Sequence, residues 1–424
     1  MTAPKLLPRA ARPPRSPRIH SADLRGAARL ATDATAGLTD LVEAMHERIA
    51  RIPGLSTAPL DGRTGGISGL VYKTIRGVTR LAGGSIEALL GLLTPALSPT
   101  PVAAVPGRER EAIVAALNGV LGDYLAATNN PLATPMALRQ GGRPLPLEAG
   151  ALKMALPAAG PRLLVLLHGL CMNDMQWLRA GHDHDHGAGL AQAHGYTPVY
   201  LHYNSGLHVS INGHALAEQL EHLLDAWPQP VERCVLLGHS MGGLLARSAL
   251  HCGMQRGQRW PARVTDLVCL GTPHHGAPLE RAGNWVDLVL GATPYAAPFA
   301  RLGQVRSAGI TDLRHGNLLD EDWVGRDRFA RGADRRQHLP LPDGVRCFAV
   351  AATTAQASGH LKDRLLANLL GDGLVPLDSA LGRHKNPARN LAFPQEQQWV
   401  GHGMNHLDLL GRPEVFAQLR QWLA

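Results

Sequence analysis

A serine enclosed by glycines is the clearest chemical signal in this sequence of 424 residues. Residues 238–242 read Gly-His-Ser-Met-Gly and follow the apolar run Cys-Val-Leu-Leu. A strand before such a motif and a helix after it place the serine on a strained turn, where its hydroxyl projects above a sheet. An ordinary glycine-serine turn is the alternative, but the flanking strand and helix favour a nucleophile at Ser240.

The same segment, extended by Gly243, resembles the nucleophile turn of the lipase and esterase branch of the α/β-hydrolase superfamily, which includes bacterial triacylglycerol lipases. The resemblance covers the chain from about Leu163 to the C-terminus and leaves out the first 150 residues. It implies an α/β fold with a mostly parallel sheet, helices on both faces and a cap insertion. It also implies that a carboxylic ester is cleaved through an acyl-enzyme on the serine.

A serine nucleophile needs an imidazole to take its proton and a carboxylate to orient that imidazole, and in this fold the carboxylate precedes the histidine. Asp372 lies in Gly-Asp-Gly-Leu-Val-Pro, which resembles the lipase segment that carries the acid; a glycine-rich surface turn is the alternative. His406 lies in Met-Asn-His-Leu-Asp, which resembles the lipase histidine segment. His402 is the rival base, but it sits between two glycines, whereas apolar residues that follow His406 would hold its ring still.

The oxyanion hole is expected at the end of an earlier strand. Residues 163–167 form a continuous apolar run, as buried parallel strands do, and His-Gly-Leu follows. The resemblance to lipases places one oxyanion donor at the backbone amide of Leu170 and the second at that of Met241. A plain strand-end turn is the alternative for the His-Gly pair.

Three further segments have residue types that bind metals or line sites. Residues 182–186 read His-Asp-His-Asp-His, but alternate residues of an extended loop point in opposite directions, so a polar loop near the site entrance is favoured over zinc. Asp408 matches a calcium ligand of the lipases, yet residues 351–355 offer no carboxylate as the second ligand. We therefore predict neither a metal nor another cofactor. Gly-Thr-Pro-His-His-Gly (271–276) resembles a lipase segment and is expected to shape the acyl pocket, with no catalytic role for its histidines.

Composition divides the chain into three parts. Residues 1–20 are rich in proline and arginine and read as a disordered basic tail, and residues 21–150 as a helical extension that ends in a β-hairpin. Residues 151–424 alternate strand and helix patterns and are expected to form the hydrolase domain, with a cap or lid around 277–344; a decorative helical insertion is the alternative there. Hydrolysis of a small ester should then survive removal of residues 1–150.

Apolar runs and helical patterns outline the expected elements of the hydrolase domain. The predicted strands are Leu163–Leu167, Thr197–Leu201, Arg233–Leu237, Leu267–Leu270, Arg346–Val350 and a last one around Trp399-Val400. The helical patterns that separate them cover residues 187–194, 212–226 and 242–252.

The net charge of +8 is concentrated at the N-terminus, because residues 1–30 hold seven basic side chains and one acidic. The rest of the chain is nearly neutral, so nucleic acid is not an expected partner. A basic amphipathic pattern over residues 67–81 is compatible with peripheral membrane contact, although packing on the main domain is favoured. Five scattered cysteines and the lack of a signal-peptide pattern favour a cytoplasmic protein with reduced thiols.

Together these motifs favour a serine hydrolase that cleaves a lipid or another hydrophobic acyl ester. An acyltransferase with the same triad, in which an alcohol replaces water, is a second hypothesis. A non-enzymatic scaffold on a lipid or granule surface, with a relic hydrolase domain, is the third. Every triad position has a credible occupant, and this argues against a relic.

Overall fold

The structure is a computed structural model of the chain, and it describes residues 22–33, 107–179, 184–277, 306–329, 334–356 and 371–424. The expected tail 1–20, the amphipathic pattern 67–81 and the first half of the expected cap lie outside these residues. Within the expected extension, residues 22–33 form a helix.

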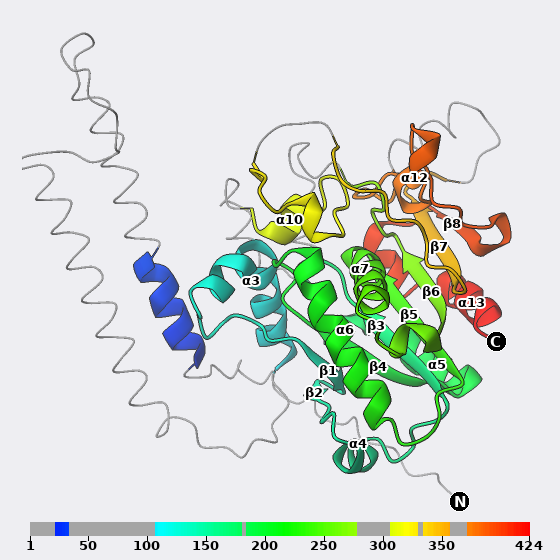
Figure 1. Cartoon of the computed structure of the whole chain (residues 1–424), viewed down its shortest axis with the longest axis horizontal. Helices are drawn as coiled ribbons and strands as arrows, with labels where there is room; N and C mark the ends of the chain where they lie inside the picture. The colour runs from blue at the N-terminus through cyan, green and yellow to red at the C-terminus, as the bar shows by residue number, and fades with distance from the viewer. Residues whose placement is uncertain (1–21, 34–106, 180–183, 278–305, 330–333, 357–370) are drawn as a thin grey trace, which may run out of the picture.

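An eight-stranded sheet forms the centre of the described fold, as Figure 1 shows. Its strand order is β2-β1-β4-β3-β5-β6-β7-β8. The strands from β3 to β8 run parallel, and β1 pairs antiparallel with both β2 and β4. The strands are β1 (Ala137–Gln140), β2 (Arg143–Pro144), β3 (Arg162–Leu167), β4 (Thr197–His202), β5 (Arg233–His239), β6 (Val264–Leu270), β7 (Arg346–Thr353) and β8 (Gln398–His402).

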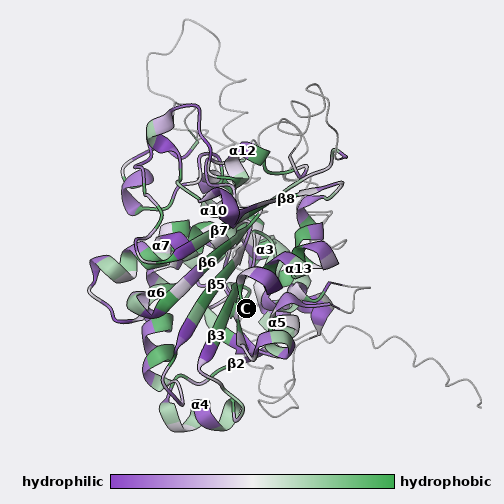
Figure 2. Ribbon diagram, turned by 90° about the vertical axis from the view of Figure 1, so that its right-hand side faces the viewer, coloured by the Kyte–Doolittle hydropathy of each residue, from purple (hydrophilic) through white to green (hydrophobic). Residues whose placement is uncertain are grey.

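Helices cover both faces of this sheet, which is why its parallel strands are buried on both sides. Side chains alternate across each strand, so Leu163 and Val165 of β3 face one core while Leu164 and Leu166 face the other. Figure 2 shows the apolar strands between the two helical layers. The first layer holds α3 (Arg108–Ala127), α6 (Val209–Ala226) and α7 (Met241–Gln255), and the second holds α5 (His186–His194) and α13 (Pro413–Trp422).

The predicted α/β fold with a mostly parallel sheet is confirmed. The predicted strands are present as β3 to β8, and the helical patterns between them are α5, α6 and α7. Helix α6 begins at Val209, three residues before its apolar pattern, because a carboxylate from far along the chain caps it: the Val209 amide donates to Asp312 over 2.8 Å. Shorter helices complete the described fold: α4 (Ala149–Ala155), α10 (Ala308–Asp312) and α12 (Leu377–Ala380).

The hairpin that we assigned to the N-terminal extension belongs to the hydrolase sheet. Strand β1 pairs with β4, with Leu138 opposite Leu201, and the Leu138 side chain is buried in the core beside α6 and α7. The sheet therefore starts well before residue 151. Turn residues predict a hairpin from the sequence, but they do not indicate which sheet the hairpin joins.

Helix α3 is likewise built into the domain rather than attached to it. Ala116 and Val120 lie in the same core as the strands. A Cβ on Gly119 would lie 2.8 Å from the Cα of Cys171, so the helix backbone lies directly against the loop that follows β3. The boundary expected at residue 150 thus falls inside one packed unit.

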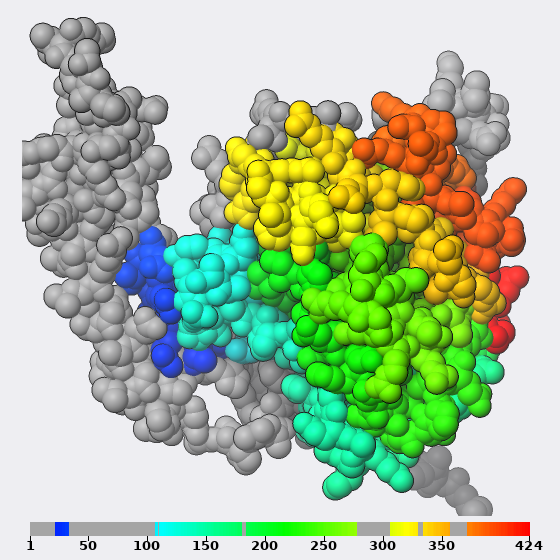
Figure 3. Space-filling view, in the orientation of Figure 1, coloured from blue at the N-terminus to red at the C-terminus, as the bar shows by residue number. Residues whose placement is uncertain are grey.

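The described second half of the expected cap rests on α3 and on the loop after β4. Figure 3 shows residues 306–329 in yellow, above the cyan α3 and the green helices. The Ser307 hydroxyl donates to the Gly119 carbonyl over 2.6 Å, and the Gly309 amide donates to Gly206 over 3.0 Å. These contacts hold the segment at the end of the sheet where the parallel strands finish.

In the described ranges, no helix is both long and apolar enough to cross a lipid bilayer. All five cysteines fall within those ranges, and each is buried with a free thiol. Burial raises the pKa of Cys171, Cys234 and Cys269 to about 12, so these thiols stay protonated at neutral pH.

Candidate active site

Ser240 occupies a strained turn between β5 and α7. Its backbone has φ 55° and ψ −123°, a conformation that costs a non-glycine residue on the order of 1–3 kcal/mol. The Ser240 amide donates to the Leu270 carbonyl over 2.8 Å, which fixes the turn to the end of β6. Side chains at the two flanking glycines would overlap backbone atoms, because a Cβ on Gly238 would meet the Gly243 amide and one on Gly242 would meet Leu167.

Asp372 and His406 form a buried pair, and each is 2% exposed. His406 Nδ1 lies 2.6 Å from Asp372 Oδ2. A carboxylate oxygen can only accept here, so Nδ1 carries the proton and Nε2 carries the lone pair. Among the described residues, His406 Nε2 is buried and has no hydrogen-bond partner.

The aspartate is fixed by its own tight loop. Its second oxygen, Oδ1, accepts from the amides of Leu374 and Val375 over 3.0 and 2.8 Å. Gly373 has φ 93°, a conformation that favours glycine and lets the chain turn around the carboxylate. The His406 amide also donates to the Asp372 carbonyl over 3.0 Å, so the two loops are joined by backbone as well as by side chains.

His406 meets the serine turn at the ends of β5 and β6. Gly271 follows Leu270, and a Cβ there would lie 3.1 Å from the His406 ring. The ring of His239, the residue before Ser240, has its centroid 4.7 Å from that of His406. The structure therefore brings Ser240, Asp372 and His406 to one end of the sheet.

His402, the rival base, lies elsewhere. It is the last residue of β8, its side chain is exposed, and the buried partner of Asp372 is His406. We expected both histidines in the loop after the last strand; only His406 lies there, in a 3₁₀ turn over His406–Leu410. The buried Leu409 and Leu410 anchor this turn in the core.

Two buried histidines position the His406 turn, and the sequence analysis did not single them out for this role. His239 Nε2 lies 3.1 Å from the His406 carbonyl, and His186 Nε2 lies 2.9 Å from the Leu409 carbonyl. Burial lowers the pKa of His239 well below its ordinary value and that of His186 to about 4, so both rings are neutral and donate these hydrogen bonds. The sequence could have pointed to His239, since it occupies the x position of the Gly-x-Ser motif next to the serine.

The loop after β3 packs against the serine. A Cβ on Gly169 would lie 3.0 Å from the Ser240 Cβ, so Leu170, the next residue, is adjacent to the turn. Met241 is the first residue of α7, where a helix leaves its amides without intrahelical acceptors. Both candidate donors therefore belong to segments that border Ser240.

Cys171 gives this loop an unusual backbone. It has φ 60°, and its amide donates to the Ser205 hydroxyl over 3.0 Å. His168 stacks on Tyr203, and its Nδ1 lies 2.8 Å from the Gly169 carbonyl. Burial lowers the pKa of His168 to about 3, so it is a neutral donor. These contacts fix the backbone conformation of the loop at Leu170.

The sequence analysis considered a metal at residues 182–186 and at Asp408. The described residues of both segments make contacts within the protein. Asp185 caps α5 by accepting from the Ala188 amide, and His184 Nε2 lies 2.9 Å from His186 Nδ1. His182 and Asp183 lie outside the described residues. Asp408 accepts from the Asn405 amide over 2.9 Å and so serves the 3₁₀ turn that carries His406.

A buried cluster of Glu111, Asp174 and His202 has ligand atoms within 4.8 Å of one another, which is a spacing that suits a metal. A cation is already present, because Arg139 Nη1 lies 2.9 Å from Glu111 and 3.3 Å from Asp174. Burial opposes ionisation of Asp174, but His202 and Arg139 outweigh it and hold its pKa below the ordinary value. This cluster reads as an ion-pair network between α3, β1 and β4.

Residues 160–337 match a family model described as a PGAP1-like alpha/beta domain. The chain carries an α/β-hydrolase fold. The matched range contains Ser240 and stops before Asp372 and His406. No curated protein matches the sequence.

Solved structures to which the chain is similar include lipases, esterases and a thioesterase. The propeptide form of the lipase BlEst2 from Bacillus licheniformis is 18% identical with a TM-score of 0.37, over 62% of this chain and half of the lipase. The RedJ thioesterase of Streptomyces coelicolor is 18% identical with a TM-score of 0.33, over 62% of this chain and 91% of that one. A hormone-sensitive lipase from a metagenome library is 14% identical with a TM-score of 0.35, over 79% and 97% of the two chains.

Proposed function

We propose that this protein is a serine hydrolase that cleaves carboxylic esters through an acyl-enzyme on Ser240. The observation that carries the proposal is the buried His406–Asp372 pair, which leaves Nε2 without a partner among the described residues, at the same end of the sheet as a serine held on a strained turn. A nucleophile, a base and a group that orients the base are what acyl transfer requires.

In the first step, Ser240 Oγ attacks the ester carbonyl carbon while His406 Nε2 takes the hydroxyl proton. The carbonyl oxygen becomes an oxyanion, which the amides of Leu170 and Met241 stabilise; each such donor is worth about 3–4 kcal/mol in the transition state. Asp372 stays ionised and stabilises the imidazolium. The intermediate then collapses, and the alcohol leaves with the proton that His406 returns to it.

In the second step, water attacks the acyl carbon of the ester on Ser240. His406 Nε2 takes a proton from the water, and the same two amides stabilise the second oxyanion. Collapse releases the carboxylic acid, and His406 returns the proton to the serine oxygen. The orientation of His406 must therefore persist through both steps, which fits the anchoring of its turn by His239 and His186.

The proposal extends to a hydrophobic acyl group, such as that of a lipid, and to a cytoplasmic location. The sequence between residues 285 and 299 supports the first point, because it is rich in apolar residues and apolar residues that line a site favour an apolar substrate. Five free, buried cysteines support the second, since free thiols persist in reducing compartments.

The test is turnover of p-nitrophenyl esters graded by acyl length. Wild type should hydrolyse them with a preference for longer chains, and Ser240→Ala should lose on the order of 10⁴-fold or more in kcat. Ser248→Ala, two turns along the same helix, removes a buried hydroxyl that donates to Leu318 and should retain activity. A folded wild type without ester hydrolysis would refute the proposal, and esters formed from added alcohols would point to acyl transfer.

A further inference from the structure

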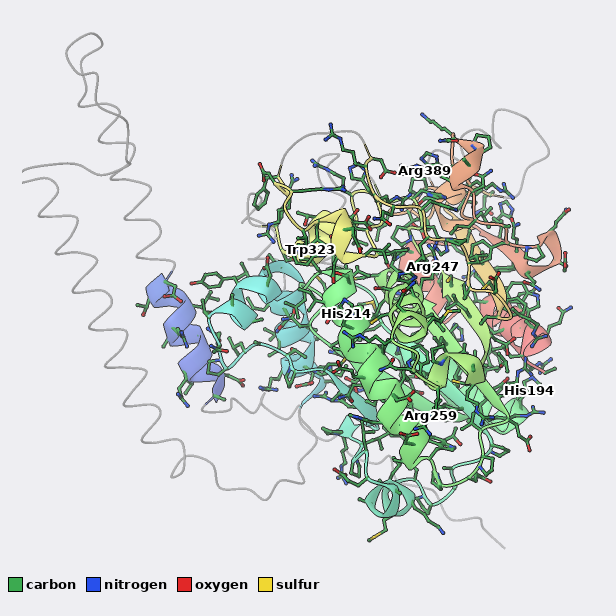
Figure 4. The ribbon with its side chains drawn as sticks, in the orientation of Figure 1. His194, His214, Arg247, Arg259, Trp323 and Arg389 are labelled. Atoms are coloured by element: carbon green, nitrogen blue, oxygen red, sulfur yellow. The ribbon has the colours of Figure 1, made fainter. Side chains whose placement is uncertain are left out.

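A small basic pocket lies beside the loop 271–276. Its empty volume, which includes space open to solvent, is about 250 Å³. Figure 4 labels Arg247 on α7 and Arg389 on the segment above it. The side chains that matter here are Arg247, His274, His275, Arg336, His338 and Arg389.

Arg247 forms the floor of the pocket and is 3% exposed. Its Nη1 lies 3.2 Å from His274 Nδ1, and its Nη2 donates to the Leu339 carbonyl. Its Nε is buried and, among the described residues, has no hydrogen-bond partner. Burial lowers the pKa of Arg247 to about 10, so the guanidinium remains charged at neutral pH.

His274 presents a second donor of the same kind. A guanidinium can only donate, so His274 Nδ1 accepts from Arg247 and the ring proton sits on Nε2. Burial, reinforced by Arg247, lowers the pKa of His274 well below its ordinary value, so the ring is neutral. His274 is 1% exposed, and within the described residues its Nε2–H also lacks an acceptor.

The charge around these two donors is not balanced by carboxylates. Arg336 and Arg389 both pair with Asp334, at 3.2 and 2.7 Å. In the part of the chain that the structure describes, Asp334 is the one carboxylate that pairs with any of the three arginines of this pocket. A buried cation without a counter-charge is costly, and buried donors without acceptors add to that cost.

We infer that this pocket binds one oxyanion group: a phosphate, sulfate or carboxylate. Arg247 Nε–H and His274 Nε2–H donate to it, and the excess positive charge favours an anion over a neutral acceptor. The inference stands whether or not the protein hydrolyses esters. Because Gly271 of the same loop packs on His406, an occupied pocket would stiffen the loop beneath the base.

The anion can come from two sources, since Gln337 and His338 at the mouth are exposed to solvent. It is either a free inorganic ion or the anionic group of a larger molecule whose remainder projects from the mouth. Inorganic phosphate and butyl phosphate separate the two. Binding of phosphate alone identifies a free ion, and butyl phosphate that binds at least as tightly identifies a group on a larger ligand.

Isothermal titration at constant ionic strength tests the inference. Wild type should bind one equivalent of phosphate saturably, and Arg389→Gln should bind roughly 10-fold more weakly or worse, because one of the positive charges around the pocket is lost. Arg256→Gln is the matched control. It ends the same helix, is exposed and pairs with Glu218, so phosphate binding should be unchanged.

A crystal soaked in selenate gives a readout that needs no variant. An anomalous selenium peak within hydrogen-bond distance of Arg247 Nε and His274 Nε2 is the expected result. Wild type without saturable binding would overturn the inference. So would an equal loss of affinity in Arg256→Gln and Arg389→Gln, because that would indicate general attraction to a basic protein.

Discussion

At the scale of single residues, the structure separates the two candidate bases. His406 is buried against Asp372 and lies next to His239, the residue before Ser240, whereas His402 is exposed at the end of β8. The orientation of an imidazole matters because its lone pair must point at the serine proton. His406 therefore has the burial and the carboxylate partner that the proposed general base requires, and His402 is a surface residue.

Alanine variants should show this difference directly. His406→Ala should lose on the order of 10³-fold or more in kcat, because serine without its base is a poor nucleophile. His402→Ala, the matched control, should stay within a few-fold of wild type. Initial rates at saturating ester give both numbers, provided that circular dichroism shows both variants folded. The reverse ordering would move the base to His402.

The candidate residues of the proposed site could be identified from the sequence because each motif is local. The glycines at 238 and 242 indicate the strained turn, and the glycines around Asp372 indicate the tight loop. The positioning histidines could not be found in this way. His186 precedes Leu409 by 223 positions and meets its carbonyl only after α5 has packed beside α13.

At the scale of elements, α3 supports the loop that carries a candidate oxyanion amide. Gly119 lies against Cys171, whose neighbour Leu170 carries a candidate oxyanion amide. Asn204, in the loop after β4, donates to the Gly122 carbonyl of the same helix over 2.8 Å. The sequence predicts a helical extension over residues 21–150, but the partner of α3 could not be inferred, because the spacing of glycines on a helix does not identify the surface that approaches it.

A pair of glycine-to-alanine changes tests this support. Gly119→Ala should lower the free energy of unfolding by about 1–3 kcal/mol through overpacking and lower kcat/KM at least about 10-fold, since the loop at Leu170 must shift. Gly150→Ala, inside α4 with open space around it, should stabilise the protein by about 0.5–1 kcal/mol and leave turnover unchanged. Urea unfolding and ester kinetics measure both effects. Equal behaviour of the two variants would show that α3 does not support the loop.

At the scale of the whole molecule, the domain begins earlier than the sequence suggested. The hairpin adds β1 and β2 to the sheet, and α3 fills one of its cores. Binary patterning identified the parallel strands because both of their faces are buried. It predicted the hairpin of β1 and β2 but not its pairing with β4, because such short, partly exposed strands carry too little apolar pattern to identify their partner.

Two truncations distinguish the corrected boundary from the expected one. Removal of residues 1–106 should leave a cooperative unfolding transition and ester turnover within a few-fold of wild type. Removal of residues 1–150 should abolish cooperative unfolding, because it strips α3 and β1 from the core. Thermal melts followed by circular dichroism decide this. A folded, active protein that lacks residues 1–150 would restore the boundary first expected from the sequence.

Stability should also fall as the pH drops below 6.5. His168 and His186 have pKa values lowered by burial to about 3 and about 4, from an ordinary 6.5. The unfolded chain therefore binds more protons below pH 6.5, so the stability that depends on the neutral rings is complete above pH 6.5 and is lost as the pH falls to about 4 for His186 and about 3 for His168. At pH 5, each of these two histidines lowers the free energy of unfolding by about 2 kcal/mol.

Urea unfolding at pH 7 and pH 5 measures this loss. In His186→Asn, which cannot take up the proton, the loss should be smaller by about 2 kcal/mol. His222→Asn, at an exposed position on α6, is the control and should show the pH dependence of wild type. Identical curves for His186→Asn and wild type would contradict the assignment.

The central claim is that Ser240 is the covalent nucleophile, and a fluorophosphonate probe tests it most directly. Mass spectrometry of the labelled, digested protein should place one adduct on Ser240. Ser240→Ala should take up no label, and His406→Ala should label far more slowly, because the hydroxyl has lost the base that removes its proton. An adduct on another residue, or labelling of folded Ser240→Ala that matches wild type, would contradict the claim.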